Sequence, residues 1–434
     1  MKKLIKKFLP SFLISFYHFC LAFLGVFLYC FPSKKIKVIG ITGTKGKSTV
    51  VILAGKILEE AGFRIGWISS ATLKIDQKEW LNPYHLTMPG RFFLQKMIKK
   101  ALKKGCKYFL IEVTSEGILQ HRHRFIDFDA AVFTNLSPEH IERHGSFENY
   151  RAAKGKLFKT TKEIHIINLD NENSEYYLKF PAKEKWGYEI NSKFKTQNSK
   201  PQLKIKPQLK IVKAENCQIL NDGLSFFIEN IEFRLKLYGK FNIYNALAAI
   251  SIALSQGINL ETCKKALEKI ETIPGRMEMV INYPFKVIVD FAHTPDSFNE
   301  IFKLVKNWPH NRIISVFGAA GGGRDKWKRP EMGKIASQYC DKIILTTEDP
   351  YEEDSLKIIK EIEKGTEESG FKMENCIKIE DRKEAIKKGL ELAQRDDIVL
   401  ILGKGTEQSL IIGNQKIPWD ERRIVQEEFK KLNP

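Results

Sequence analysis

Cysteine is scarce in this sequence, with only seven among 434 residues. None belongs to a CxxC pair, and the seven are widely spaced: Cys20, Cys30, Cys106, Cys217, Cys263, Cys340 and Cys376. Disulfide frameworks and zinc sites need closely spaced or paired cysteines. The pattern therefore argues against both and favours a protein of a reducing compartment.

A nucleic-acid-binding signature is also missing, although the formal net charge is +19. A basic balance of this size suits nucleic acid, an anionic membrane surface or acidic small substrates. No RNP-type aromatic pattern, zinc finger or helix-turn-helix signature occurs. We therefore rank nucleic acid last and expect no nucleic-acid partner.

Formal charge is absent from residues 8–31, FLPSFLISFYHFCLAFLGVFLYCF. Crossing a bilayer takes about 20 apolar residues, and aromatic residues near both ends of the run suit a membrane interface. Lysines lie on either side, in MKKLIKK and at 34, 35 and 37. The run predicts a hydrophobic helix within residues 1–36 that associates with a membrane, either spanning it or lying in its interface. The alternative is a helix packed on the protein core or in a dimer contact.

The stretch that carries most chemistry is 38–50, VIGITGTKGKSTV. A β-branched run stops at a glycine-rich loop, and a helix-like segment follows, which is the layout of a phosphate-binding P-loop. Glycines let the backbone turn its N–H groups toward phosphate, and a helix N-terminus adds positive potential. The usual first glycine of the pattern is replaced by Ile41, with Gly40 and Gly43 nearby. The alternative is an ordinary glycine-rich turn between a strand and a helix.

From this loop we predict a nucleoside triphosphate site with Mg²⁺. Lys47 would reach the terminal phosphates, and the Ser48 hydroxyl would hold the metal. The remaining loop positions would cradle phosphate, which makes the predicted set Gly43, Thr44, Gly46, Lys47, Ser48 and Thr49.

Strand-like and helix-like segments alternate from residue 37 onward, which predicts an α/β fold with a mostly parallel sheet. Strands are expected at 37–41, 64–69, 108–113, 130–134 and 163–168, and in a second series at 286–290, 312–317, 342–346 and 397–402. We expect three parts: 1–36, an ATP-binding domain over 37–272 with a small antiparallel insertion at 193–237, and a Rossmann-like domain over 273–434. Ligands of such sheets bind beyond the strand carboxyl ends, and we expect the catalytic cleft between the two domains.

Two further groups of residues suggest metal chemistry. Glu112 ends a predicted strand, where a carboxylate suits Mg²⁺, although a helix cap or a surface acid is the plainer reading. Residues 133–158 bring together Glu139, His140, Glu142, His144 and Lys154. Clustered histidine and glutamate near a phosphate site suggest a second metal. A lysine there would repel a cation, unless it is carbamylated and so an anion.

These segments resemble the Mur ligase family, and most closely its tripeptide-synthetase branch, which adds the third residue of the peptidoglycan stem. The matching runs are TGTKGKST (42–49), EVTSEGILQHR (112–122), FTNLSPEHIERHG (133–145), YRAAKGKLF (150–158), YGKFNIYNALAAI (238–250), IPGRME (273–278), VDFAHTPDS (289–297), FGAAGGGRDKWKRPEMG (317–333), TTEDP (346–350), DRKEAI (381–386) and LGKGTE (402–407). They follow family order and cover nearly all of the chain from residue 37 onward.

The resemblance implies ATP and Mg²⁺ as cofactors and assigns roles by position. Lys47, His140 and carbamylated Lys154 would be catalytic, and the metal ligands would be Ser48, Glu112, His140 and Lys154. Further nucleotide contacts would come from Asn245, Arg276, Asp290 and His293. Substrates would touch Thr87, Ser115, Arg122, Asp349, Gly403 and Glu407, with the last two holding the incoming amino acid.

The implied reaction is ATP-dependent amide formation on a muramoyl-peptide precursor through an acyl phosphate. Two departures leave substrates open. Residues 1–36 stand where the family has a domain for the UDP-sugar end, and Tyr351 stands where diaminopimelate enzymes have an arginine. Rival readings are a related ligase for another acid, of polyglutamate or cyanophycin type, and a membrane-tethered nucleotide-binding scaffold. Because ATP is cytosolic, we expect a cytoplasmic location, at the inner face of the membrane.

Overall fold

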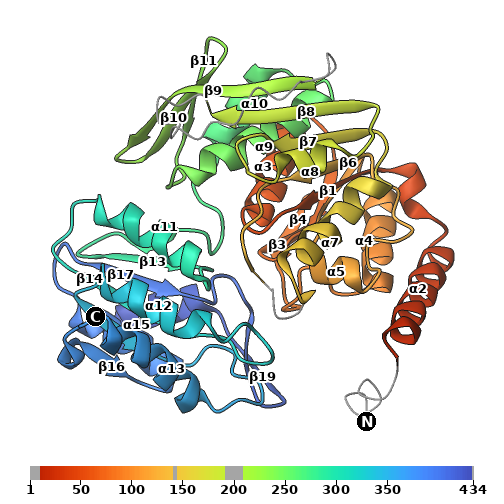
Figure 1. The fold of residues 1–434 in the computed structure, drawn as a ribbon. Helices are drawn as coiled ribbons and strands as arrows, with labels where there is room; N and C mark the ends of the chain where they lie inside the picture. Colours follow the sequence, from red (N-terminus) through yellow and green to blue (C-terminus); the bar gives the residue numbers. More distant parts are fainter. Residues whose placement is uncertain (1–9, 140–143, 191–208, 433–434) are drawn as a thin grey trace. The chain divides into compact units, whose positions relative to one another are not determined.

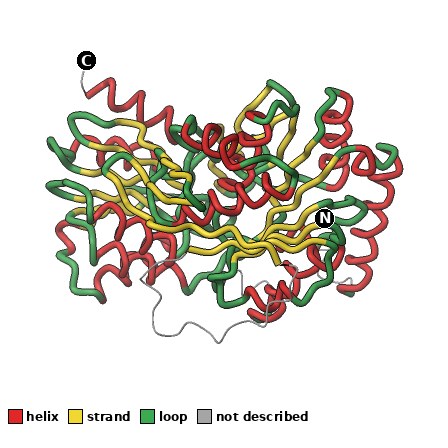
Figure 2. Tube along the Cα trace, turned by 90° about the horizontal axis from the view of Figure 1, so that it is seen from above, coloured by secondary structure: helices red, strands yellow, loops and turns green. Residues whose placement is uncertain are grey.

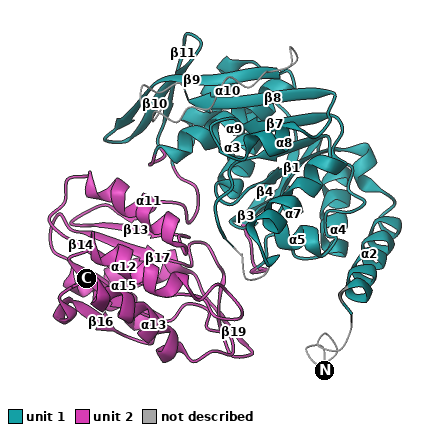
Figure 3. Ribbon diagram, in the orientation of Figure 1, with its two compact units in different colours: residues 1–80, 86–236, 240–271 teal, residues 81–85, 237–239, 272–434 magenta. Residues whose placement is uncertain are grey.

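The computed structural model describes residues 10–139, 144–190 and 209–432 of the chain. It divides into two compact units, coloured separately in Figure 3. The first consists of residues 1–80, 86–236 and 240–271, and the second of residues 81–85, 237–239 and 272–434. The short segment 81–85 therefore belongs with the second unit, although its neighbours in sequence belong to the first.

The first unit is built on an 11-stranded sheet with the order β11-β10-β9-β8-β7-β6-β1-β5-β2-β3-β4 (Figure 1). Its elements are α2 (Ser11–Leu28), η1 (Pro32–Lys35), β1 (Lys37–Thr42), α3 (Lys47–Glu60), β2 (Ile65–Ile68), β3 (Thr72–Ile75), β4 (Lys78–Leu81), α4 (Arg91–Lys103), β5 (Tyr108–Glu112), α5 (Ser115–Leu119), β6 (Ala130–Phe133), α7 (Phe147–Thr160), β7 (Ile164–Asn168), α8 (Ser174–Leu178), β8 (Glu184–Ile190), β9 (Leu209–Leu220), β10 (Gly223–Ile228), β11 (Ile231–Leu235), α9 (Phe241–Ser255) and α10 (Leu260–Glu268).

The central strands of this sheet are mostly apolar because helices cover both faces. β1 pairs in parallel with β5 on one side and β6 on the other. Buried side chains of β1, β5, β6 and β7 pack with those of α4, α5, α7 and α8 in one hydrophobic core. Helices α3 and α9 pack together and contact the sheet as well. Continuous apolar strands are what a doubly covered parallel sheet requires.

The segment expected as a small antiparallel insertion contributes β9, β10 and β11 to this same sheet. β9 pairs in parallel with β8, and only then does the chain turn back, so that β10 is antiparallel to both β9 and β11. The turn that joins β9 to β10 consists of Asn221 and Asp222. The hairpin was therefore visible in the sequence, but its docking on β8 was not.

The second unit has a six-stranded sheet with the order β12-β13-β17-β14-β15-β16, and a separate β18-β19 hairpin. Buried residues of its strands form one core with α14 and α15, while α11, α12 and α13 pack against one another. Its elements are β12 (Glu278–Ile281), β13 (Lys286–Asp290), α11 (Pro295–Lys306), β14 (Ile313–Phe317), α12 (Lys328–Ser337), β15 (Lys342–Leu345), α13 (Ser355–Glu368), η2 (Met373–Asn375), β16 (Cys376–Lys378), α14 (Arg382–Leu392), β17 (Ile398–Leu402), β18 (Ser409–Ile412), β19 (Gln415–Pro418) and α15 (Glu421–Leu432). Figure 2 shows the strands in yellow with helices in red around them.

The apolar N-terminal segment includes helix α2, which packs on α4. Phe19 and Phe23 place their rings against Phe125, and the Ser15 hydroxyl lies 2.8 Å from Nε2 of His121. Among the described residues, no helix is long and apolar enough to cross a membrane.

Candidate active site

The predicted phosphate loop lies at the carboxyl end of the central strand β1. Helix α3 begins at Lys47, directly after the loop, and β5 runs beside β1 with Glu112 paired to Ile41. This register brings the last carboxylate of β5 to the start of α3. The Ser48 hydroxyl donates a hydrogen bond of 2.7 Å to Oε2 of Glu112, and Nζ of Lys47 lies 3.9 Å from Oε1.

Glycine is required at Gly46 of this loop. Gly46 has a φ of +80°, a left-handed value that a side chain makes costly. An added Cβ would also collide with Oδ1 of Asn245 on α9. Asn245 is buried and donates a 2.8 Å hydrogen bond to Oδ1 of Asn242. The predicted nucleotide residue Asn245 is thus held directly against the loop.

Two residues after β6, Thr134 and Asn135, also hold the loop in place, although neither was predicted to have a role. Asn135 accepts a 2.9 Å hydrogen bond from the Lys45 backbone N–H through its side chain, and another of 2.9 Å from Thr44 through its carbonyl. The Thr134 hydroxyl donates 2.7 Å to the Lys45 carbonyl. Both follow β6, so their place at a strand end next to β1 was the signal that would have identified them.

Lys154 of α7 is buried against the same loop and donates a 2.7 Å hydrogen bond to the Gly43 carbonyl. Burial, together with the charge of Lys47, lowers the pKa of Lys154 well below its ordinary value, against the opposing charges of Glu139 and Glu112. A lysine in this setting gives up its proton readily. Its amine is then a nucleophile, which is the form that reacts with CO₂ to give the predicted carbamate.

The other predicted catalytic residue, His140, lies outside the described residues. His144 is described: its Nε2 lies 3.1 Å from the hydroxyl of the predicted substrate residue Ser115, and its ring packs edge-on against Tyr150. Ser115 is buried at the start of α5, immediately beyond the end of β5.

Two predicted substrate residues, Arg122 and Thr87, both lie next to Met88. Arg122 donates hydrogen bonds to the Met88 carbonyl and, at 2.7 Å, to Oε1 of Gln120. Thr87 precedes Met88 and is half-buried. Arg122 thus holds the backbone that presents Thr87.

In the second unit, the predicted nucleotide residues gather around the end of β13. The buried Asp290 carboxylate accepts hydrogen bonds from the backbone of Met277 (2.7 Å) and Ala292 (2.6 Å). Burial raises its pKa, although the charge of Arg276 and these two hydrogen bonds oppose the rise. The Arg276 guanidinium lies 4.5 Å from the centre of the Phe291 ring. Asp290 therefore shapes the backbone, rather than presenting a free carboxylate.

His293 and Gly403 flank this strand end. Nδ1 of His293 lies 2.7 Å from the Phe291 carbonyl, and the His293 carbonyl accepts a 2.9 Å hydrogen bond from Lys328. Gly403 donates its N–H to the Asp290 carbonyl at 3.0 Å. Its φ is +116°, and the space that a Cβ would take is filled by the Glu348 carboxylate.

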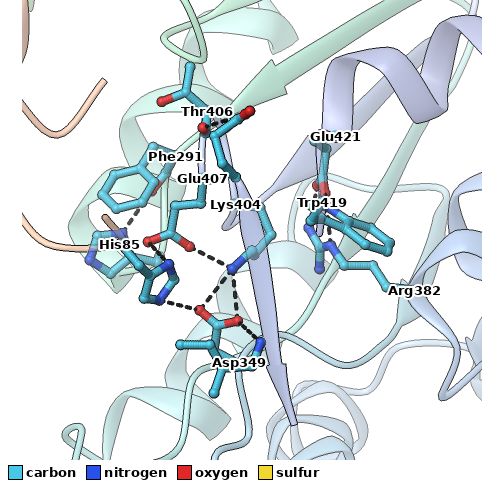
Figure 4. Close-up of polar contacts among 12 residues, drawn as sticks. His85, Phe291, Asp349, Arg382, Lys404, Thr406, Glu407, Trp419 and Glu421 are labelled. Carbon is cyan, nitrogen blue, oxygen red and sulfur yellow. Dashed lines mark hydrogen bonds and ion pairs between the residues drawn. The ribbon is translucent and has the colours of Figure 1, made fainter. Parts of the chain in front are cut away.

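The second unit also contains a tight cluster of charged groups, shown in Figure 4. Nζ of Lys404 lies 2.8 Å from both carboxylate oxygens of Asp349 and 2.6 Å from Oε2 of Glu407. His85, from segment 81–85, completes it: Nε2 lies 2.8 Å from Oδ2 of Asp349, and Nδ1 lies 3.3 Å from Oε1 of Glu407. The prediction named Asp349 and Glu407 but neither Lys404 nor His85.

Neighbouring charges in this cluster determine the direction in which the pKa values of Asp349 and Lys404 shift. Burial raises the pKa of Asp349, but the His85 hydrogen bond and the Lys404 charge outweigh it, and the pKa falls to about 2. Burial lowers the pKa of Lys404, but Glu407 and Asp349 outweigh it, so the pKa is raised. His85, Asp349 and Glu407 have the ligand types of a metal site. The Lys404 ammonium already binds Asp349 and Glu407, however, and would repel a metal ion.

A buried ion pair braces the loops that carry this cluster. Arg382, at the start of α14, donates a 3.0 Å hydrogen bond from Nε to Glu421 of α15, and both side chains are fully buried. The same guanidinium donates to the carbonyls of Thr347 (3.2 Å) and Leu402 (2.8 Å). These carbonyls lie two residues before Asp349 and Lys404. The ion pair is visible beside the cluster in Figure 4.

The residues around the phosphate loop fit a magnesium nucleotide. Ser48 and Glu112 offer a hydroxyl and a carboxylate oxygen 2.7 Å apart, and Mg²⁺ prefers hard oxygen ligands of this kind. Lys47 stands beside them at the helix N-terminus, where phosphate binds. The Ser70 backbone N–H also donates to Glu112 at 2.8 Å, which orients the carboxylate.

Comparison with protein-family models matches the Mur ligase middle domain over residues 41–253 and the Mur ligase glutamate ligase domain over residues 275–405. A relative from Clostridium acetobutylicum, named UDP-N-acetylmuramoyl-L-alanyl-D-glutamate–2,6-diaminopimelate ligase 1, is 36% identical over 421 residues, or 95% of this chain and 82% of the relative. The chain belongs to the Mur ligase family.

A further relative and a solved structure agree with this family membership. A UDP-N-acetylmuramyl-tripeptide synthetase from Roseiflexus sp. is 36% identical over 92% of this chain and 80% of its own. A solved structure of a UDP-N-acetylmuramoyl-L-alanyl-D-glutamate–2,6-diaminopimelate ligase matches with a TM-score of 0.57 at 27% identity, over 92% of this chain and 79% of that one. The family, the α/β fold class and the activity of an ATP-dependent ligase that uses Mg²⁺ are thereby confirmed.

Proposed function

We propose that this Mur ligase adds an amino acid to a muramoyl-peptide precursor of peptidoglycan through an acyl phosphate. The observation that carries the proposal is the phosphate loop: Lys47, Ser48 and Glu112 meet at the start of α3, and Lys154 is buried against the loop. The names of the relatives support a muramoyl-peptide acceptor. One relative is named as a ligase of UDP-N-acetylmuramoyl-L-alanyl-D-glutamate, and the other as a UDP-N-acetylmuramyl-tripeptide synthetase.

In this proposal residues 37–272 carry the nucleotide chemistry. The acceptor carboxylate attacks the γ-phosphate of ATP, and Lys47 offsets the charge that develops on the transferred group. Ser48 and Glu112 would hold Mg²⁺, which would supply positive charge to offset that of the phosphates. Carbamylated Lys154 and His140 would hold a second metal. Thr87, Ser115 and Arg122 would position the acceptor.

Residues 273–434 supply the remaining groups, apart from Asn245, which belongs to the first unit. Asn245 of the first unit, with Arg276, Asp290 and His293 of the second, are assigned to the nucleotide. Gly403, Glu407 and Asp349 are assigned to the incoming amino acid. The carboxylates Asp349 and Glu407 are suited to an ammonium group. Tyr351 follows Pro350 at the position where diaminopimelate enzymes carry an arginine, so the choice among amines is part of the test.

The test measures ADP release with a UDP-linked muramoyl dipeptide and each of L-lysine, L-ornithine and meso-diaminopimelate, followed by mass spectrometry of the product. We expect fast ADP release only when ATP, the dipeptide and one of these amines are all present, with product mass increased by one amino-acid residue. Lys47→Ala should abolish turnover, because Lys47 is the loop residue predicted to reach the terminal phosphates, and Lys45→Ala is the matched control.

Three results would contradict the proposal. ADP release that needs neither dipeptide nor amine would indicate an ATPase, and release supported by folate or polyglutamate acids instead would indicate the rival ligase class. Unchanged turnover in Lys47→Ala would remove the phosphate-loop assignment.

We further propose that helix α2 lies against the inner face of the cytoplasmic membrane. Its outer side exposes Phe12, Phe16, Phe27 and Leu28, each more than 60% accessible. Lys34 and Lys35 lie in η1, shortly after the end of the helix, and the chain carries a net charge of +19. Aromatic and aliphatic side chains beside lysines suit an anionic lipid interface, in which an apolar helix face inserts while cations pair with headgroups.

A further inference from the structure

Helix α2 packs beside the segment that holds the predicted acceptor residue Arg122. The Ser15 hydroxyl lies 2.8 Å from Nε2 of His121, the residue directly before Arg122. Ser15 belongs to the same half of α2 that exposes Phe12 and Phe16. An α-helix with its side chains is about 10 Å across, so the apolar side of α2 lies about one helix width from the acceptor segment.

The start of helix α4 holds the same segment. Arg91, the first residue of α4, donates two hydrogen bonds to the Gln120 carbonyl, of 3.1 Å from Nε and 2.7 Å from Nη2. The Gln120 side chain in turn accepts a 2.7 Å hydrogen bond from Arg122. Burial first, and then the charge of Arg122, lower the pKa of Arg91, whereas Tyr17 of α2 acts in the opposite direction. Within the first unit, α2, α4 and the acceptor segment therefore pack together.

Helices α2 and α4, with η1 between them in sequence, form a surface that is rich in lysine. α4 exposes Lys96, Lys100 and Lys103, which recur at the spacing of one helix face, and η1 exposes Lys34 and Lys35. No aspartate or glutamate occurs in any of the three elements. Anionic lipid headgroups attract lysines near the membrane surface, and an apolar helix beside the lysines supplies the part that inserts. The α2–α4 surface thus combines the charge and the apolar side chains that an anionic membrane requires.

We propose that this enzyme takes its acceptor from the membrane, as a muramoyl dipeptide linked through a diphosphate to a lipid. This inference rests on the proposed function, including the membrane contact of α2. A protein that binds the membrane through α2 and α4 holds Arg122 close to the layer in which the headgroup of such a lipid lies. Enzyme and acceptor then meet on one surface, where the effective concentration of the acceptor is high. The UDP-linked dipeptide has the same diphosphate and reacting carboxylate, so it remains a substrate from solution, but it has no anchor at the surface.

The test compares two carriers of one muramoyl dipeptide. Addition of the accepted amino acid is measured with the UDP-linked dipeptide, and with the same dipeptide linked through a diphosphate to a polyprenyl chain in vesicles of anionic phospholipid. A third arm adds empty vesicles to the UDP-linked dipeptide. We expect KM, as bulk concentration, to be about 100-fold lower for the lipid-linked dipeptide, which is the low end of the gain from tethering. Empty vesicles should leave KM for the UDP-linked dipeptide unchanged.

Charge reversal on α4 connects the preference to this surface. The double variant Lys100→Glu/Lys103→Glu should raise KM for the lipid-linked dipeptide at least tenfold, because a negative helix face is repelled by anionic lipid. It should leave kcat and KM for the UDP-linked dipeptide unchanged, since both lysines are exposed on the helix surface. Lys162→Glu/Lys179→Glu is the matched control, because it reverses two exposed lysines of the same unit outside α2, η1 and α4. The control should keep the wild-type KM for both carriers.

A second variant removes the apolar contribution of the same surface. Phe16→Ser/Phe27→Ser should raise KM for the lipid-linked dipeptide and leave that for the UDP-linked dipeptide unchanged, because both side chains are exposed. Activity with the UDP-linked dipeptide shows in each case that the variant is folded.

Several results would overturn the inference while leaving the proposed function in place. These are equal KM values for the two carriers, or turnover of the UDP-linked dipeptide alone. A lipid preference that persists in both double variants would show that the acceptor reaches the enzyme over another surface. Empty vesicles that lower KM for the UDP-linked dipeptide equally would show that the membrane activates the enzyme without supplying its acceptor. If neither dipeptide supports ADP release, the proposed function itself fails.

Discussion

At the scale of single residues, Lys154 shows how burial prepares a side chain for chemistry. An ammonium loses its hydration on burial, and the nearby Lys47 charge disfavours it further, so the neutral amine is favoured. The sign is the usual one for a buried lysine: the charged form is the one that folding destabilises. Neutral amines add CO₂, and the resulting carbamate is an anion that a metal can use.

Lys154 should therefore bear a carbamate. In bicarbonate buffer enriched in ¹³C, the wild-type protein should show a carbamate carbon signal that is absent in Lys154→Gln, and that variant should lose at least 100-fold in ADP release. Lys156→Gln, on the same helix but directed outward, is the control. A wild-type protein without the signal but with full activity would exclude the modification.

Sequence reasoning singled out the loop at 43–49, Glu112 and Lys154, and the structure brings these residues together, while their roles stay predictions. It did not find His85, which lies in the connection NPYHLTMPG and meets Asp349 only through the fold. Nor did it find the brace between Arg382 and Glu421, which are 39 residues apart. Contacts of this kind depend on how two segments dock, and no local pattern records them. The role of His140 stays a prediction.

At the scale of elements, helix α2 exposes several large apolar side chains to solvent. Its inner side is occupied by α4 and the Phe125 region, whereas four large apolar side chains of its outer side face solvent. Burying such side chains is worth about 1.5–3 kcal/mol each. That is enough for reversible binding to a surface.

We expect the protein to cosediment with vesicles of anionic phospholipid and to be released when Phe16 and Phe27 are both changed to Ser. Vesicles of neutral lipid should bind it more weakly, because the lysine contribution is then lost. Ile219→Ser, which removes an exposed apolar side chain from β9, is the control. Equal sedimentation of the double variant and the wild type would reject α2 as the contact.

The parallel strands were the elements most accurately predicted. All nine expected strands are present within a residue or two of their predicted ends, because each is a short apolar run bounded by turn residues. Strands β3 and β4 were not expected, since each is only four residues long, TLKI and KEWL, and each contains charged residues close to the turn at Asp76. The pairing of β9 with β8 depends on tertiary docking and was likewise not predictable.

At the scale of the whole molecule, chemistry is divided between the two units. The first contains the phosphate loop with Ser48, Glu112 and Lys154, and the second contains the carboxylate cluster with His85 and Lys404. Activating an acid and supplying an amine are separate tasks, and each unit has side chains suited to one of them. The central claim is that an acid is phosphorylated before the amine attacks.

The most direct test of that claim is to trace the oxygen atoms of the acceptor carboxylate into the released phosphate. The muramoyl dipeptide is prepared with ¹⁸O in its acceptor carboxylate and turned over with ATP and the accepted amino acid, and the inorganic phosphate is analysed by mass spectrometry. An acyl phosphate transfers one carboxylate oxygen to phosphate, so we predict one ¹⁸O in each phosphate released. Amide product accompanied by unlabelled phosphate would show that the carboxylate never attacked ATP, and would contradict the account.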